Sequence, residues 1–156
     1  MKWEEIQTAF DWDGSWRDLY VLDASRDDWH RILDALRSSG YAVRFWRDHD
    51  AGPVPESVDG LFAGESEQGS LLSIVAGGVT VNAHFFQDDE VEFDIDPREV
   101  STAERGEAVL ALMRLIGRAC DRPVRLTPEN MSELVLIEYD PASDSLRKEH
   151  EFRGLL

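Results

Sequence analysis

Carboxylates at every second position mark one segment of the chain, HFFQDDEVEFDIDP at residues 84–97. The acidic residues of this alternation are Glu90, Glu92, Asp94 and Asp96. The residues between them are the apolar Val91, Phe93 and Ile95. Because side chains alternate between the two faces of a strand, we expect the apolar residues to face a core and the carboxylates to share the opposite face. Carboxylates about 7 Å apart repel one another, so water, a cation or a partner's Lys or Arg has to screen them.

A hairpin with the preceding segment, VTVNAHFF, determines what lies beside these carboxylates. A loop with an odd number of residues, centred on Asp88, places the apolar residues of both strands on one face. A slip of one residue would turn acids toward the core, so burial favours the odd loop. In that register His84 lies opposite Glu92, and Asn82 lies opposite Asp94.

Three interpretations of this acidic strand remain open. It is a solvated outer face that resists edge-to-edge pairing, a docking surface for a basic protein, or a metal or catalytic site that uses His84, Glu92 and Asp94. We favour docking, with no catalytic residue and with no metal or other cofactor. The residues predicted to contact the partner are Asp88, Asp89, Glu90, Glu92, Asp94, Asp96, His84 and Phe86.

The charge of the whole chain favours a basic protein partner. The 156 residues include 32 acidic and 16 basic ones, which gives a net charge of −16 at pH 7. Such a field repels nucleic-acid phosphates and anionic lipids, so we expect neither a nucleic-acid nor a membrane partner. No apolar run approaches the roughly 20 residues of a membrane span. A single cysteine, Cys120, and an N-terminus without an apolar signal core favour the cytoplasm.

Recognisable catalytic motifs are absent from the sequence. It has no P-loop, no GxGxxG, no HExxH and no GxSxG nucleophile elbow. Its four histidines are scattered and form no ligand set, and Cys120 falls on the apolar side of a predicted helix. Two alternatives to docking stay open: a metal-dependent or small-molecule-binding enzyme centred on His84, Glu92 and Asp94, and a housekeeping domain.

Two amphipathic helices are predicted from apolar residues at positions i, i+3, i+4 and i+7. The first begins at Ser25, which can cap it together with Asp28, and Gly40 follows as a stop. Its apolar stripe consists of Trp29, Ile32, Leu33 and Leu36. The second begins near Ser101 or Thr102 and has the stripe Val109, Leu112, Met113 and Ile116. Its opposite face carries arginines that are solvated, pair with acids elsewhere in the chain or receive an acidic partner; they are Arg114, Arg118 and Arg122.

The remaining segments predict an antiparallel β-meander, because their connections are too short for parallel crossovers. The expected strands cover residues 19–23, 41–46, 60–64, 71–77, 79–86, 90–96, 124–126 and 133–139. Residues 47–60 are expected to form the longest loop, and the last ten residues to be an edge strand or a tail. We therefore expect one α+β domain over residues 1–156, with the two amphipathic helices packed on one face of the sheet.

Several segments occur in a recognisable order along most of the chain. They are DGSWRDLYVL, DDWHRILDAL, the acidic hairpin EVEFDIDPREV, a following helix, and VRLTPEN. This order resembles small acidic bacterial immunity proteins of polymorphic toxin systems. The resemblance implies stoichiometric inhibition of a toxin, often a basic nuclease, by covering the toxin's site. It implies no catalytic residue.

Overall fold

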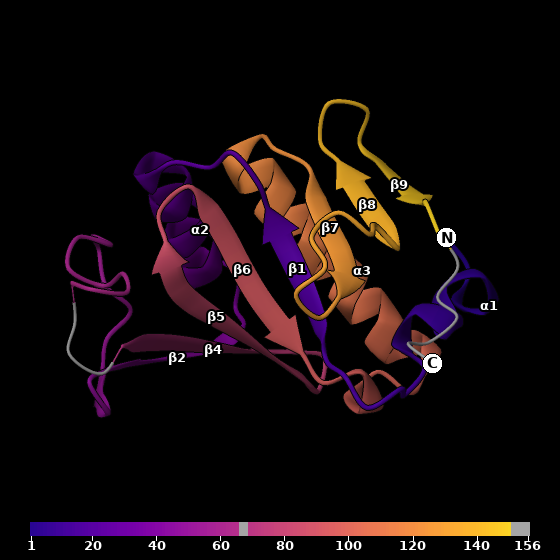
Figure 1. Ribbon diagram of the computed structural model, residues 1–156, viewed down its shortest axis with the longest axis horizontal. Helices are drawn as coiled ribbons and strands as arrows, with labels where there is room; N and C mark the ends of the chain where they lie inside the picture. The colour runs from indigo at the N-terminus through magenta and orange to yellow at the C-terminus, as the bar shows by residue number, and fades with distance from the viewer. Residues whose placement is uncertain (66–68, 151–156) are drawn as a thin grey trace.

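A sheet with helices packed against it makes up the computed structural model, which describes residues 1–65 and 69–150 (Figure 1). Within these residues the chain forms three α-helices and one nine-stranded sheet whose strands pair antiparallel. The predicted α+β class with antiparallel strands is confirmed. The helices are α1 (Trp3–Ile6), α2 (Arg26–Ser38) and α3 (Ala103–Cys120). The strands are β1 (Arg17–Val21), β2 (Ala42–Arg47), β3 (Asp50–Gly52), β4 (Ser70–Ala76), β5 (Val79–Gln87), β6 (Glu90–Ile95), β7 (Val124–Pro128), β8 (Ile137–Asp140) and β9 (Ser145–Lys148).

The strand order combines two meanders. Along the sheet the order is β3-β2-β4-β5-β6-β1-β7-β8-β9, so β4 to β6 and β7 to β9 are neighbours in sequence as well as in space. The first strand, β1, lies between β6 and β7 and joins the two halves. As a result, residues near the N-terminus lie directly beside the acidic strand β6 (Figure 1).

The helix α2 begins as its sequence predicts. The Ser25 hydroxyl accepts a hydrogen bond from the Asp28 amide at 3.2 Å, and the Asp28 carboxylate accepts one from the Ser25 amide at 3.0 Å. This reciprocal capping satisfies two backbone amides that the helix leaves unpaired. The predicted apolar stripe is buried, and it consists of Trp29, Ile32, Leu33 and Leu36.

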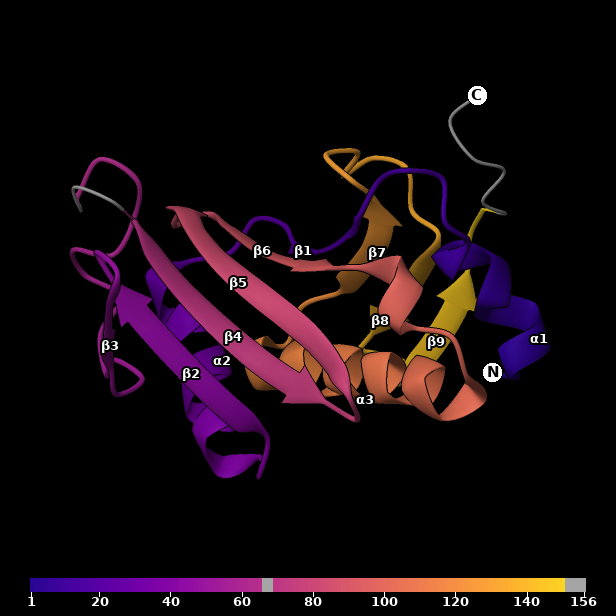
Figure 2. The same ribbon diagram turned by 90° about the horizontal axis from the view of Figure 1, so that it is seen from below.

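The helix α3 packs against α2 and against β4, β5, β7 and β8. It begins after Thr102, whose side chain accepts a hydrogen bond from the Arg105 amide, and it ends at Asp121 in the left-handed conformation. A small residue allows a close approach to β8, since a Cβ atom added to Gly117 would lie 2.6 Å from the Tyr139 ring. Figure 2 shows α3 running along the lower side of the view, beneath β5 and β6.

The β5–β6 hairpin has the predicted register, with His84 opposite Glu92. Near the turn, however, a β-bulge shifts the pairing so that Gln87 lies opposite Glu90. The turn itself is therefore the pair 88–89. Burial requires a register in which the apolar residues of both strands share one face. A β-bulge and a two-residue turn together produce this register, in place of the predicted loop with an odd number of residues centred on Asp88.

One strand prediction is wrong and a second is right only for its last three residues, because burial alone does not define a strand. Residues 60–64 form a loop whose Leu61 and Phe62 are buried, and the Ala63 amide donates to the Phe85 carbonyl of β5 at 2.9 Å. The strand predicted at residues 133–139 begins only at Ile137, after a loop.

The polar regions also differ in detail from the expectation. The predicted loop 47–60 contains the short strand β3, which pairs with β2. The alternatives predicted for the last residues are an edge strand and a tail, and β9 is an edge strand. Residues 151–156 lie outside the described residues. Among the described helices, none has both the length and the apolar character needed to cross a bilayer.

Candidate functional site

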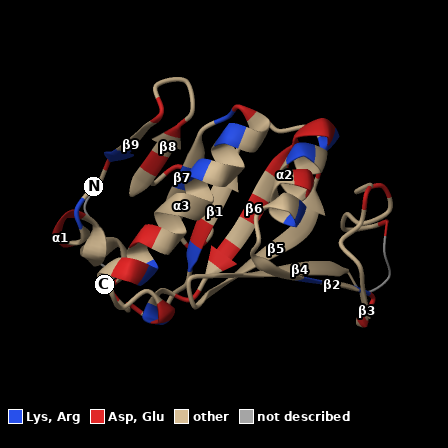
Figure 3. Cartoon of the chain, turned by 180° about the vertical axis from the view of Figure 1, so that it is seen from behind, with Lys and Arg blue, Asp and Glu red and all other residues tan. Residues whose placement is uncertain are grey.

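Three adjacent strands, β5, β6 and β1, bring polar side chains to one side of the sheet. Their pairing aligns two rows of residues across the strands. One row consists of Asn82, Asp94 and Asp18, and the other consists of His84, Glu92 and Tyr20. We call the side of the sheet formed by these six residues the acidic face. Figure 3 shows acidic residues recurring on β6.

A hydrogen bond joins His84 and Asp94 diagonally across β5 and β6. The distance from His84 Nε2 to Asp94 Oδ2 is 2.6 Å, and Asn82 donates to the other carboxylate oxygen of Asp94 at 3.2 Å. The bond to Asp94 raises the pKa of His84, although partial burial opposes the increase. When His84 is protonated, the pair is a half-buried imidazolium and carboxylate with no net charge.

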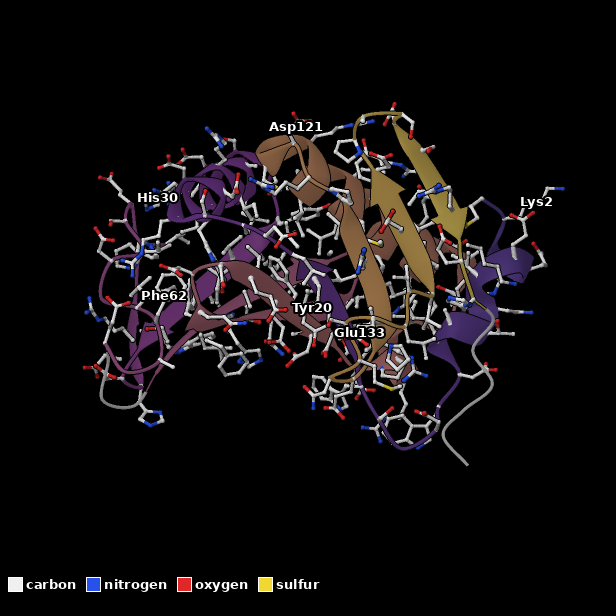
Figure 4. The ribbon with its side chains drawn as sticks, turned by 45° about the horizontal axis from the view of Figure 1, so that its top comes forward. Lys2, Tyr20, His30, Phe62, Asp121 and Glu133 are labelled. Atoms are coloured by element: carbon white, nitrogen blue, oxygen red, sulfur yellow. The ribbon has the colours of Figure 1, made fainter. Side chains whose placement is uncertain are left out.

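Asp18 is the most buried carboxylate of the acidic face, with 2% of its surface exposed. Its Oδ2 atom accepts hydrogen bonds from the Tyr20 hydroxyl at 2.9 Å and from the Asn130 amide at 2.7 Å. Both donors are neutral. Burial raises the pKa of Asp18, and these two hydrogen bonds oppose the increase only in part. Figure 1 shows the loop after β7 passing in front of the sheet, and Figure 4 labels Tyr20 and the loop residue Glu133.

The hydroxyl of Tyr20 has one proton but two carboxyl neighbours. Besides Asp18, the Oε1 atom of Glu92 lies 3.3 Å from the Tyr20 oxygen. Burial and the nearby charge of Asp18 raise the pKa of Glu92. A single proton cannot form full hydrogen bonds with two carboxylates. One of the two carboxylates therefore has to bind a proton of its own, water, or a cation from outside the chain.

Two of the predicted contact residues already pair with arginines of the chain. The Asp88 carboxylate lies 3.0 Å from the Arg26 guanidinium, which also contacts Asp59 and Glu65. Asp96 directly follows β6, and its carboxylate contacts the guanidinium of Arg98 at 2.9 Å. These two acids therefore do not belong to the acidic face.

The other predicted contact residues surround the turn of the hairpin. Glu90 accepts a hydrogen bond from the Gln87 amide at 2.7 Å, and Asp89 is exposed. Phe86 is 54% exposed and stacks on His84, with ring centroids 5.2 Å apart and an interplanar angle of 5°. The structure thus adds an exposed aromatic ring to the edge of the acidic face.

A groove of about 510 Å³ begins beside this ring stack. Its wall includes Trp46 of β2, Leu71 of β4, and His84 and Phe86 of β5. The strand pairing sets Trp46 opposite Leu71 and Leu71 opposite His84, so these side chains lie in register with Glu92. We call this depression the aromatic groove. It is continuous with the acidic face.

The residues of the proposed metal or catalytic site make other contacts. His84 and Asp94 bind one another, and Glu92 contacts Tyr20. In the described part of the chain, no group of three or more His, Cys, Asp or Glu residues has an arrangement that could hold a metal ion. The arrangement is a hydrogen-bonded carboxylate network with one shared donor.

Sequence reasoning missed Asp18, Tyr20 and Trp46. Asp18 and Tyr20 alternate with apolar residues in RDLYV, a signal that could have placed them on a polar face. The sequence does not reveal that β1 pairs with β6, because that pairing joins residues at least 70 positions apart. Trp46 reaches the groove only because β2 and β4 are neighbours.

No family model matches this chain, and a search of curated proteins found no match. The function therefore has to be inferred from the chemistry of the site. That chemistry consists of carboxylates, an imidazole and a phenol beside a groove with one exposed and one partly buried aromatic ring.

Proposed function

We propose that the protein is a non-catalytic binding domain that docks a basic protein on the acidic face. One observation carries this proposal: among the described residues, no Lys or Arg pairs with Glu92, Asp94 or Asp18. A chain with a net charge of −16 gains little from further carboxylates on such a face. A partner that supplies Lys or Arg side chains would relieve this repulsion on binding.

The fold supports an open position for this face. The inward residues of β5 and β6 belong to the same buried core as the apolar stripes of α2 and α3. We propose that both helices cover that inward side, which leaves the acidic face to solvent except near the loop that contacts Asp18. On the neighbouring strands, Arg125 and Arg147 both pair with Glu138, so the charge of this carboxylate is compensated.

The resemblance to immunity proteins of toxin systems suggests the biological role. We propose stoichiometric inhibition of a basic toxin, with the acidic face covering the toxin's site. Electrostatic attraction would mainly raise the association rate and the specificity, and the exposed aromatic residues would add affinity. We place the protein in the cytoplasm, which is supported by its single cysteine, a buried thiol whose pKa is raised by burial to about 11.

The test compares two charge reversals, Glu92→Lys on the acidic face and Glu104→Lys as a matched control. Glu104 is an exposed residue in the first turn of α3, and both substitutions change the net charge equally. The tagged chain is used to capture and identify its partner from its own host. The association rate of the purified partner is then measured at low and high salt.

We expect Glu92→Lys to slow association by about tenfold at low salt and to flatten the salt dependence. Glu104→Lys should have a clearly smaller effect. Equal slowing by the two variants would mean that only the net charge matters, and docking at the acidic face would be wrong.

A further inference from the structure

Another exposed aromatic ring, that of Trp12, lies beneath an arginine of the same chain. The guanidinium of Arg98 lies 4.0 Å from the ring centroid of Trp12, and Arg26 lies 5.1 Å from that of the buried Phe62. These distances are typical of cation–π contacts. Among the described residues, no arginine of the chain lies over Phe86 or Trp46, the two rings of the aromatic groove.

The exposed ring of Phe86 is held in a fixed orientation. It stacks nearly parallel on the imidazole of His84, and His84 is in turn held by its hydrogen bond to Asp94. Because this stack uses only one face of the Phe86 ring, the ring is both fixed in place and 54% exposed. An exposed ring that is already ordered loses little conformational freedom when a partner side chain packs against it.

The groove leads from these aromatic rings to a carboxylate. Leu71, His84 and Glu92 lie opposite one another on three adjacent strands, each about 5 Å from the next. A side chain lying in the groove over Leu71 would therefore have its end within reach of Glu92. Its stem would contact apolar and aromatic surface, and its end would meet negative charge.

Arginine fits this combination better than other side chains. Its planar guanidinium stacks on aromatic rings and also forms paired hydrogen bonds with a carboxylate, whereas the ammonium of lysine is a compact, strongly hydrated charge. An apolar side chain would remove water from Glu92 without replacing its hydrogen bonds, which is unfavourable. The imidazolium of His84 does not exclude a cation, because its charge is compensated by Asp94.

We propose that the aromatic groove binds an arginine side chain of the basic partner, with the guanidinium stacked on Phe86 and paired with Glu92. This proposal rests on the proposed function and adds the identity of the anchoring residue to it. Such an arginine would be the specific contact within a broader electrostatic attraction. Its guanidinium would also donate to the carboxylate of Glu92, which shares the single hydroxyl proton of Tyr20 with Asp18.

The test uses two peptides of equal charge, five Arg-Gly repeats and five Lys-Gly repeats, titrated against the full chain. Binding is measured by calorimetry at low salt. We expect the arginine peptide to bind about three- to tenfold more tightly than the lysine peptide. Glu92→Gln should weaken both peptides, because it removes the carboxylate that either cation would meet.

Two substitutions of Phe86 separate stacking from apolar contact. Because this side chain is exposed, Phe86→Leu and Phe86→Ala are not expected to unfold the protein. Both should bring the ratio of arginine to lysine affinity close to one, since neither retains a π face. As a control, Trp12→Ala removes another exposed aromatic ring, and it should leave the ratio unchanged.

The possible failures are distinguishable. If both peptides bind equally to the unmodified chain with the salt dependence of an acidic surface, the arginine anchor is wrong and docking at the acidic face survives. A preference for arginine that persists in Phe86→Leu also overturns the anchor. If neither peptide binds even at low salt, both the anchor and the proposed function fail.

Discussion

Asp18 and Asp28 are both 2% exposed, yet within the described residues only Asp28 forms ion pairs with arginines. The carboxylate of Asp28 contacts Arg122 at 2.8 Å and Arg31 at 3.2 Å, and it also caps α2. Asp18 has only the hydroxyl of Tyr20 and a backbone amide as donors. These two buried aspartates therefore differ in their surroundings. The charge of Asp28, at the start of α2, is compensated by arginines, whereas the donors to Asp18 on the acidic face are neutral.

The pKa values of the two residues move in opposite directions. Burial tends to raise the pKa of Asp28, but hydrogen bonds from Arg122 and Ser25 and the charge of Arg122 outweigh it, and the pKa falls. For Asp18 burial prevails and the pKa rises. A paired buried carboxylate stabilises the fold as an anion, whereas an unpaired one works against it. The acidic face thus contains charge that folding does not require, which is what a docking surface needs.

The largest expected effect is on the helix side. Asp28→Ala removes the side-chain half of the reciprocal cap of α2 and leaves the Ser25 amide and the Arg122 guanidinium without their acceptor. We expect the free energy of unfolding at pH 7 to fall by about 2–3 kcal/mol, measured by urea denaturation. As a matched comparison, Asp18→Asn should leave the stability unchanged or increase it, because the amide oxygen can still accept from the Asn130 amide.

A loss of stability in Asp18→Asn equal to that of Asp28→Ala would contradict the comparison. It would mean that Asp18, too, contributes as an anion. The charge on the acidic face would then belong to the fold, and its availability for a partner would no longer follow from its position.

The next effect is a pH dependence of opposite sign in the two regions. Because the pKa values of Asp18 and Glu92 are raised in the folded protein, stability increases as the pH falls through their folded values toward about 4, where the unfolded groups protonate. The raised pKa of His84 acts in the same sense, since its contribution is complete below about pH 6.5 and is lost at higher pH. The lowered pKa of Asp28 gives stability that is present above about pH 4 and lost as the pH falls further.

Urea denaturation over a series of pH values tests these signs. We expect the unmodified chain to be more stable near pH 5.5 than near pH 8, and to lose stability below about pH 4. A double substitution, Asp18→Asn with Glu92→Gln, should reduce the first part of this profile, leaving the contribution of His84, and should leave the second part intact. If the double variant retains the full increase between pH 8 and pH 5.5, Asp18 and Glu92 are not its origin.

Local patterns in the sequence were sufficient to predict much of the fold. The Ser25 cap and the apolar stripe of α2 are interactions within a few residues, and the register of β5 and β6 follows from burial across one hairpin. Residues 60–64 show the limit of this reasoning, because Leu61 and Phe62 are buried from a loop and not from a strand. An apolar run indicates burial, but the hydrogen-bond partners of the backbone decide the element.

The candidate site was predictable only where it lies within one hairpin. His84 and Glu92 were placed opposite one another correctly, whereas Asp88 was placed on the docking surface although it contacts Arg26. The position of Asp18 depends on β1 lying between β6 and β7, which no local pattern specifies. The sequence therefore revealed the alternation of charge but not which carboxylates are left unpaired.

The smallest expected effect concerns an ion pair that is exposed. Asp88 contacts Arg26, but both side chains reach solvent, and Asp59 and Glu65 remain as partners of the same guanidinium if Asp88 is removed. Exposed pairs of this kind contribute little, so Asp88→Asn should shift the midpoint of urea denaturation by no more than about 0.3 M. A shift as large as that of Asp28→Ala would mean that an arginine stabilises a carboxylate equally at any depth. A small shift would establish that burial together with pairing, and not pairing alone, separates the carboxylates that hold the fold from those available to a partner.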